Sequence, residues 1–193
     1  MQVIEGARAE PRDEGDRGGA GEDTEGRDQA LQQDLPVLPE ERQIEDFAQR
    51  LGPCFSPDGS SMYFADSAAR KIYSFRYGDG GVSKQRICRD LIACTGMPDG
   101  ATVDEEGCIW LVEVFGGRIH RMSPAGELLR TIDMPVLKVT SVCFGGAGLD
   151  VLYVTSMAKP SLPKYPQDGP LGGWIFAIHG LGQRGLPERR FQG

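Results

Sequence analysis

The amino-acid sequence contains no asparagine, and its first 50 residues contain no lysine and no aromatic residue before Phe47. These 50 residues hold 14 aspartates and glutamates against 6 arginines, so the overall net charge of −7 arises there. A segment with so few large apolar side chains cannot bury enough surface to offset the entropy lost on ordering. We therefore predict that residues 1–38 form a disordered acidic tail rich in Gly, Glu and Arg, and that residues 39–193 fold.

Long apolar runs are also absent. No apolar core of about seven residues follows Met1, as a signal peptide would require, and no stretch approaches the roughly 20 apolar residues of a membrane span. The five cysteines have no CxxC spacing, which favours reduced, mostly buried thiols over a zinc site or a disulfide framework. The sequence therefore predicts a cytoplasmic protein without a membrane segment.

What the sequence does contain is a unit that occurs three times, in which a turn rich in Gly and acidic residues precedes an apolar run with an aromatic residue. The copies begin at Phe55, Val103 and Phe144, so they are separated by 48 and 41 residues. A period of roughly 40–50 residues is typical of propeller blades, each of which is a sheet of four strands. The repeat predicts an all-β propeller fold.

Residues 51–193 divide into short apolar or alternating runs separated by turns rich in Gly, Pro and Asp. We predict eleven strands, at residues 52–56, 62–65, 71–76, 82–88, 101–103, 108–112, 118–122, 128–132, 141–144, 151–155 and 174–178. A Pro-rich insertion at residues 159–170 lengthens one connection. Residues 39–51 fit either an amphipathic helix or the outer strand of a preceding blade, and the context favours the strand.

Six motifs in this region occur in order between Gly52 and Leu181. They are Gly52-Pro-Cys-Phe-Ser-Pro-Asp-Gly59, Tyr63-Phe-Ala-Asp-Ser67, Pro98-Asp-Gly-Ala-Thr-Val-Asp104, Gly116-Gly-Arg118, Thr140-Ser-Val-Cys-Phe-Gly-Gly146 and Leu152-Tyr-Val-Thr155. Together they resemble the regucalcin family, also called the gluconolactonase or senescence-marker-protein family. The resemblance implies a six-bladed propeller, of which about three blades are present here. It also implies hydrolysis of a small-molecule sugar lactone with a divalent metal, calcium being expected and zinc, magnesium or manganese being alternatives.

One residue carries most of the expected chemistry. In the family the Asp of a Pro-Asp-Gly motif that enters an inner strand is a metal ligand and a candidate general base, so the resemblance assigns both the catalytic and the metal role to Asp99. A lactonase needs a metal that polarises the ring carbonyl and a carboxylate that helps water to attack it. The alternative is an aspartate that only serves the backbone geometry of a Pro-Asp-Gly turn.

The remaining family ligands are missing from this sequence. Leu51 occupies the place of the family's Asn ligand, and the family's substrate-binding Asn has no counterpart in a chain without asparagine. The only echo of the family's Glu-Gly-Pro motif is Glu5-Gly6-Ala7, which we regard as chance because no strand pattern follows it. Two hypotheses remain: a lactonase completed from elsewhere, for example in a homo-oligomer formed through exposed blade faces, or a non-catalytic half-propeller that acts at most as a binding module.

Other candidate motifs lack the context they need. There is no GxSxG motif, and His120 and His179 are expected to be surface or edge residues, which argues against a Ser/His hydrolase. The GxGxxG match at residues 180–185 leads into Leu186 and Pro187, where a dinucleotide site would need a helix. The arginines near the end of the chain form no extended basic face, so we expect no nucleic-acid partner.

Overall fold

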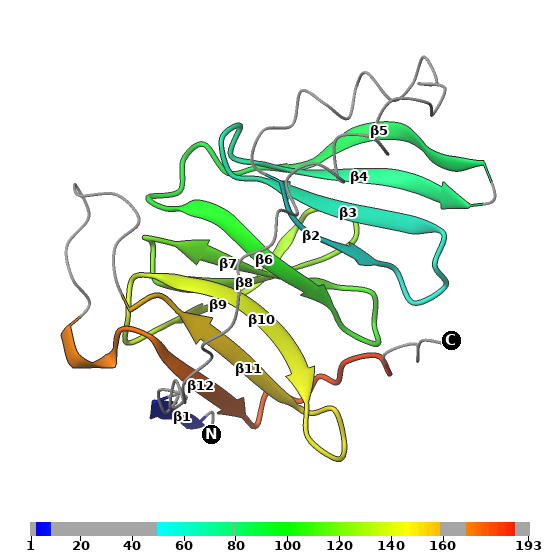
Figure 1. Cartoon of the computed structure of the whole chain (residues 1–193). Coiled ribbons are helices and arrows are strands. Elements are labelled where there is room, and N and C mark those ends of the chain that lie inside the picture. Colours follow the sequence, from blue (N-terminus) through cyan, green and yellow to red (C-terminus); the bar gives the residue numbers. More distant parts are fainter. Residues whose placement is uncertain (1–2, 9–49, 79, 159–168, 188–193) are drawn as a thin grey trace, which may run out of the picture. The chain divides into compact units, whose positions relative to one another are not determined.

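The computed structural model describes residues 3–8, 50–78, 80–158 and 169–187, all within one compact unit of the chain. These residues form three antiparallel sheets of four strands each (Figure 1). The first sheet contains β2 (Arg50–Phe55), β3 (Ser61–Asp66), β4 (Lys71–Gly78) and β5 (Gly81–Asp90). The second contains β6 (Met97–Val103), β7 (Ile109–Val114), β8 (Arg118–Met122) and β9 (Leu128–Asp133). The third contains β10 (Val139–Gly145), β11 (Val151–Ser156), β12 (Trp174–His179) and β1 (Val3–Arg8).

The eleven strands predicted from the sequence are all confirmed. β8 has the predicted bounds, and most of the others extend by one to three residues beyond them. The largest extension is in β6, which begins at Met97 and therefore includes the Pro-Asp-Gly motif. A short 3₁₀ turn, η1 (Gly169–Leu171), precedes β12. Among the described residues, no helix has the length and apolar character needed to cross a membrane.

The twelfth strand, β1, was not predicted. Val3–Arg8 pairs antiparallel with β12 and forms the outer strand of the third sheet, in the register Val3↔His179 to Arg8↔Trp174. The expectation of disorder for residues 1–38 therefore does not hold for residues 3–8, and the rest of that range lies outside the described residues. Glu5-Gly6-Ala7 lies in this outer strand, although we expected no strand there.

The pairing of β1 can be tested by hydrogen exchange. We expect the β1 amides that face β12 to exchange more than about tenfold slower than in an unstructured peptide, because ladder hydrogen bonds must open before exchange. In a Gly6→Pro variant the protection should be lost, since a Cβ at this position would lie 2.9 Å from Trp174 Cε3. Mass spectrometry or NMR on the full chain measures both rates. Unprotected β1 amides in the unmodified chain would contradict the observed third sheet.

The second sheet packs against the other two. All six residues of β7 are buried, which requires cover on both faces. Trp110 and Val112 pack in a cluster with residues of β10, β11 and β12, whereas Ile109 and Leu111 pack in a cluster with residues of β3 and β4. The core therefore lies in two layers on either side of the second sheet.

The inner strands of the three sheets, β2, β6 and β10, lie next to one another. β6 contacts both β2 and β10 (Figure 1). Each of these strands has a register irregularity in its pairing with the next strand, between Leu51 and Cys54, between Pro98 and Ala101, and between Val139 and Ser141. Such bulges redirect side chains and often occur beside functional sites. Asp99 lies within the irregularity of β6, the central one of these three neighbouring strands.

The cysteine side chains are more exposed than the sequence predicted. All five cysteines are free, but only Cys108 is buried, Cys143 is exposed and the other three are half-buried. The prediction of mostly buried thiols was therefore wrong. Residues 39–49 and most of the insertion at residues 159–170 lie outside the described residues, so the choice between helix and strand for residues 39–51 stays open up to Arg50, where β2 begins.

Candidate functional site

Asp99 lies inside strand β6 and not in a turn between strands. Pro98 pairs with Glu113 and Ala101 pairs with Leu111, so Asp99 and Gly100 together face a single residue of β7. Position 100 requires glycine, because a Cβ there would lie 2.5 Å from Ser141 Oγ and 2.7 Å from Ser141 Cα on β10. The Pro-Asp-Gly motif thus forms a bulge at the contact between two inner strands, and the alternative of a simple turn is wrong.

The environment of Asp99 changes its acidity. Its side chain is half-buried, and this burial raises the pKa of the Asp99 carboxyl from 3.8 to about 6, while a hydrogen bond from the Gly100 backbone N–H works in the opposite direction. A carboxylate with a pKa near 6 is a better proton acceptor than an ordinary aspartate and is still mostly ionised at pH 7. The catalytic role of Asp99 stays a prediction, and a pKa of about 6 is in the range that general bases use at neutral pH.

The surroundings of Asp99 do not form a calcium site by themselves. Calcium takes six to eight oxygen ligands, including several carboxylates or carbonyl groups. Within the described residues, Asp99 belongs to no group of three or more His, Cys, Asp or Glu side chains close enough to share a metal ion. Leu51, whose backbone pairs with Ala65, has no side-chain oxygen to offer. The described residues therefore do not fit the calcium ion that the resemblance implies.

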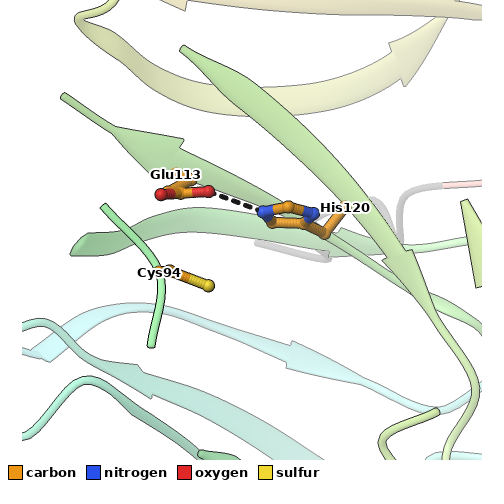
Figure 2. Close-up of side chains that lie close together, drawn as sticks. All are labelled: Cys94, Glu113 and His120. Atoms are coloured by element: carbon orange, nitrogen blue, oxygen red, sulfur yellow. Dashed lines mark hydrogen bonds and ion pairs between the residues drawn. The ribbon is translucent and has the colours of Figure 1, made fainter. Parts of the chain in front are cut away.

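A different set of metal-ligating side chains does gather in the second sheet. Cys94 precedes β6, Glu113 is on β7 and His120 is on β8, and their ligand atoms all lie within 4.8 Å of one another (Figure 2). Glu113 Oε2 and His120 Nε2 are 2.8 Å apart, with side-chain exposures of 3% and 7%. The pairing Leu111↔His120 in the β7–β8 hairpin puts Glu113 and His120 on the same face as diagonal neighbours. We call these three residues the Cys–Glu–His cluster.

Further hydrogen bonds orient the cluster. Glu113 Oε1 accepts a hydrogen bond of 2.6 Å from the Gly96 backbone N–H and one of 3.1 Å from Thr95 Oγ1. His120 Nδ1 lies 3.1 Å from Thr131 Oγ1 on β9. Burial alone would raise the pKa of the Glu113 carboxyl, but the hydrogen bonds from Gly96 and His120 together lower it below its usual value. Glu113 is therefore an ionised carboxylate in a buried position.

This cluster was not predicted from the sequence. His120 was expected at the surface or an edge, and that expectation is wrong because the residue is buried and bonded at both ring nitrogens. His179 is the last residue of β12, and its side chain is half-exposed, as expected for a surface residue. The available signal was an ionisable pair, Glu113 and His120, on two successive strands joined by the short Gly116-Gly117 turn.

The chain is similar to known proteins over most of its length. The family model for the SMP-30/Gluconolactonase/LRE-like region matches residues 17–158. The chain belongs to this family. It is 35% identical over 146 residues to regucalcin of Danio rerio, covering 72% of this chain and 48% of that protein. It is 35% identical over 144 residues to 6-deoxy-6-sulfogluconolactonase of Pseudomonas putida, covering 74% and 49%.

Solved structures of the SMP-30/gluconolactonase family show the same fold. A luciferin-regenerating enzyme superposes with a TM-score of 0.68 at 34% identity, covering 73% of this chain and 48% of that one. A calcium-binding regucalcin from Agrobacterium tumefaciens superposes with a TM-score of 0.66 at 26% identity over the same shares. The chain spans about half the length of the relatives it matches, so its three sheets correspond to a partial propeller of the regucalcin type, as predicted.

Proposed function

We propose that this chain supplies the Asp99-bearing half of a sugar-lactone hydrolase. The observation that carries the proposal is the position of Asp99, a half-buried carboxyl with a pKa of about 6 on the bulge of an inner strand. The membership of the chain in a family that includes gluconolactonases supports a lactone as substrate.

In the proposed reaction Asp99 acts as a general base. Its carboxylate accepts a proton from a water molecule while the water oxygen bonds to the lactone carbonyl carbon. The bond between that carbon and the ring oxygen then breaks, and the ring oxygen takes up the proton held by Asp99, which yields the ring-opened hydroxy acid and restores the Asp99 carboxylate. A divalent metal, where present, would polarise the carbonyl group. Among the described residues, no group of three or more His, Cys, Asp or Glu side chains close enough to share a metal ion includes Asp99, so we assign no step of the reaction to a metal.

The pH profile tests the role of Asp99. With a pKa of about 6, the base is present above pH 6 and is lost as the pH falls, so hydrolysis at pH 5 should be about tenfold slower than at the plateau. Asp99→Asn should reduce the rate by about 10² to 10⁴. A coupled pH-indicator assay with gluconolactone measures both. A variant as active as the unmodified chain would refute the role.

Asp58 provides a matched control, since it is the aspartate of a second Pro-Asp-Gly tripeptide, at residues 57–59. It lies exposed in a turn, where hydrogen bonds from Ser56 and Ser60 lower the pKa of its carboxyl to about 2. Asp58→Asn should therefore leave both the rate and the position of the pH profile unchanged. A loss of activity equal to that of Asp99→Asn would indicate a general effect on folding and would count against a specific role of Asp99.

The missing half of the site can come from a second copy of the chain, as we expected for a homo-oligomer. Val3 and Tyr153 are exposed on the face of the third sheet that points away from the core cluster. If two copies complete the site, specific activity should rise with chain concentration in parallel with the dimer fraction measured by sedimentation. Activity that is independent of concentration would contradict completion by a second copy.

A second function is favoured by one specific departure from the family. Leu51 replaces a metal-ligating Asn, and the chain has no asparagine to replace it from elsewhere. This departure supports the alternative of a non-catalytic half-propeller that acts as a binding module. Under this alternative, hydrolysis in the assay above stays at the background rate at every chain concentration, with or without added calcium. Turnover above background that depends on Asp99 excludes it.

A further inference from the structure

We propose that the Cys–Glu–His cluster is a binding site for a zinc-type transition metal ion, separate from the position of Asp99. Cys94, Glu113 and His120 supply one sulfur, one oxygen and one nitrogen, and these atoms lie within 4.8 Å of one another. Zinc is held in proteins by these three ligand types, whereas calcium and magnesium require oxygen ligands almost exclusively. The ligand set thus selects a softer metal than the one that the family resemblance implies.

The distances permit binding with small movements. In a tetrahedral zinc site with bonds of about 2.0–2.3 Å, ligand atoms are separated by roughly 3.3–3.8 Å. Glu113 Oε2 and His120 Nε2, now 2.8 Å apart, would separate by less than about 1 Å, while Cys94 Sγ would stay in place or move slightly closer. Side-chain rotation accounts for such shifts, so the strands need not move.

His120 and Glu113 have the hydrogen-bond partners that metal ligands in proteins usually have. Ligating histidines usually donate the other ring N–H to an oxygen, and ligating carboxylates are themselves hydrogen-bonded. Thr131 Oγ1 can accept from the His120 Nδ1–H group, and in that tautomer Nε2 has a lone pair for a metal, which would replace its present contact with Glu113 Oε2. The second oxygen of Glu113 is held by Gly96 and Thr95. This arrangement fixes two of the three ligands before any metal arrives.

The loop that carries Cys94 is held in place from the first sheet. Arg70 NH1 donates hydrogen bonds to the backbone oxygens of Cys94, at 3.1 Å, and of Ile92, at 3.5 Å. Gly96 and Gly116 pack directly against Glu113, and a Cβ at either position would collide with its side chain or the adjoining backbone. The cysteine is therefore presented to a carboxylate whose own position is fixed.

Charge also favours a divalent metal ion in this buried position. A divalent cation with one thiolate, one carboxylate and one neutral imidazole forms a complex without net charge, so the cost of burial is small compared with that of an isolated ion. Binding releases the thiol proton of Cys94 and any proton shared between Glu113 and His120. Three protein ligands leave a fourth tetrahedral position open for water or an anion.

Cobalt provides the spectroscopic test, since it occupies zinc sites and reports their ligands. The full chain, stripped of metal with a chelator, should bind one equivalent of Co²⁺ with a thiolate charge-transfer band and tetrahedral d–d bands. Zn²⁺ should displace the cobalt and raise Tm. Cys94→Ser should lose the charge-transfer band, and His120→Gln should lose the tetrahedral d–d bands. Far-ultraviolet circular dichroism shows whether each variant is folded. If Cys94→Ser is not folded, Cys94→Ala is used in its place.

The controls are Cys143→Ser and His179→Gln, which alter an exposed cysteine and a half-exposed histidine of the third sheet. Both should bind cobalt with unchanged spectra. A band that disappears in Cys143→Ser and persists in Cys94→Ser would overturn the proposal. So would a folded chain that takes up no cobalt or zinc at one equivalent. Neither result depends on lactone hydrolysis.

Discussion

Replacement of Asp104 by alanine should lower the free energy of unfolding by about 3–5 kcal/mol. Asp104 follows β6 and is fully buried, and its Oδ2 accepts hydrogen bonds from Arg121 Nε at 2.8 Å and from Trp110 Nε1 at 2.9 Å. Its Oδ1 accepts from the backbone N–H groups of Cys108 and Glu106. Truncation leaves the buried Arg121 guanidinium with Glu106 as its remaining charged partner among the described residues, and it removes the side-chain acceptor of the Glu106 and Cys108 backbone N–H groups.

A second Asp–Arg pair in the same sheet is the control. Asp133 contacts Arg118 at 3.2 Å, but its side chain is 85% exposed, whereas that of Asp104 is 0% exposed. Exposed pairs contribute little because water solvates the separated charges, so Asp133→Ala should cost no more than about 1 kcal/mol. Urea unfolding followed by tryptophan fluorescence and circular dichroism measures both variants. Equal losses in the two variants would show that burial of the Asp104 network does not stabilise the fold.

The strands were predictable because their signals are local. Alternating apolar residues and Gly-rich turns identified eleven of the twelve strands, and β8 was predicted with its bounds. β1 could not be found in the same way, because six residues next to a polar segment carry little signal of their own. Its position depends on the free edge of β12, more than 160 residues away in the sequence, and the two strands meet only when the third sheet forms.

The candidate site was predictable only in part, for a related reason. The Pro-Asp-Gly motif located Asp99 on an inner strand, but the His120 prediction assumed that alternate residues of β8 face water. In the structure both neighbouring sheets cover the second sheet, so Glu113 and His120 are buried on one face and Trp110 is buried on the other. Sequence alternation cannot distinguish a strand covered on both faces from one with a wet face, since ionisable side chains occur in both.

Phe176→Ala should also cost about 3–5 kcal/mol, because a large aromatic side chain would leave a cavity in the core. Phe176 is 2% exposed on β12, and it packs in the cluster that joins the second and third sheets. It also lies directly beside Gly6 of β1. Since domains of this size are stable by about 5–15 kcal/mol, the substitution removes a large share of the total.

Ile175 is the matched control for Phe176, since it is the preceding residue of β12 and its side chain lies on the opposite face, 41% exposed. Ile175→Ala should cost no more than about 1 kcal/mol. Thermal and urea unfolding of the two variants separates the contribution of the core face from that of the outer face. If β1 is part of the same cooperative unit, hydrogen exchange in Phe176→Ala should also speed up at β1. A loss of protection at β12 without one at β1 would contradict their pairing, because the two strands share one ladder of hydrogen bonds.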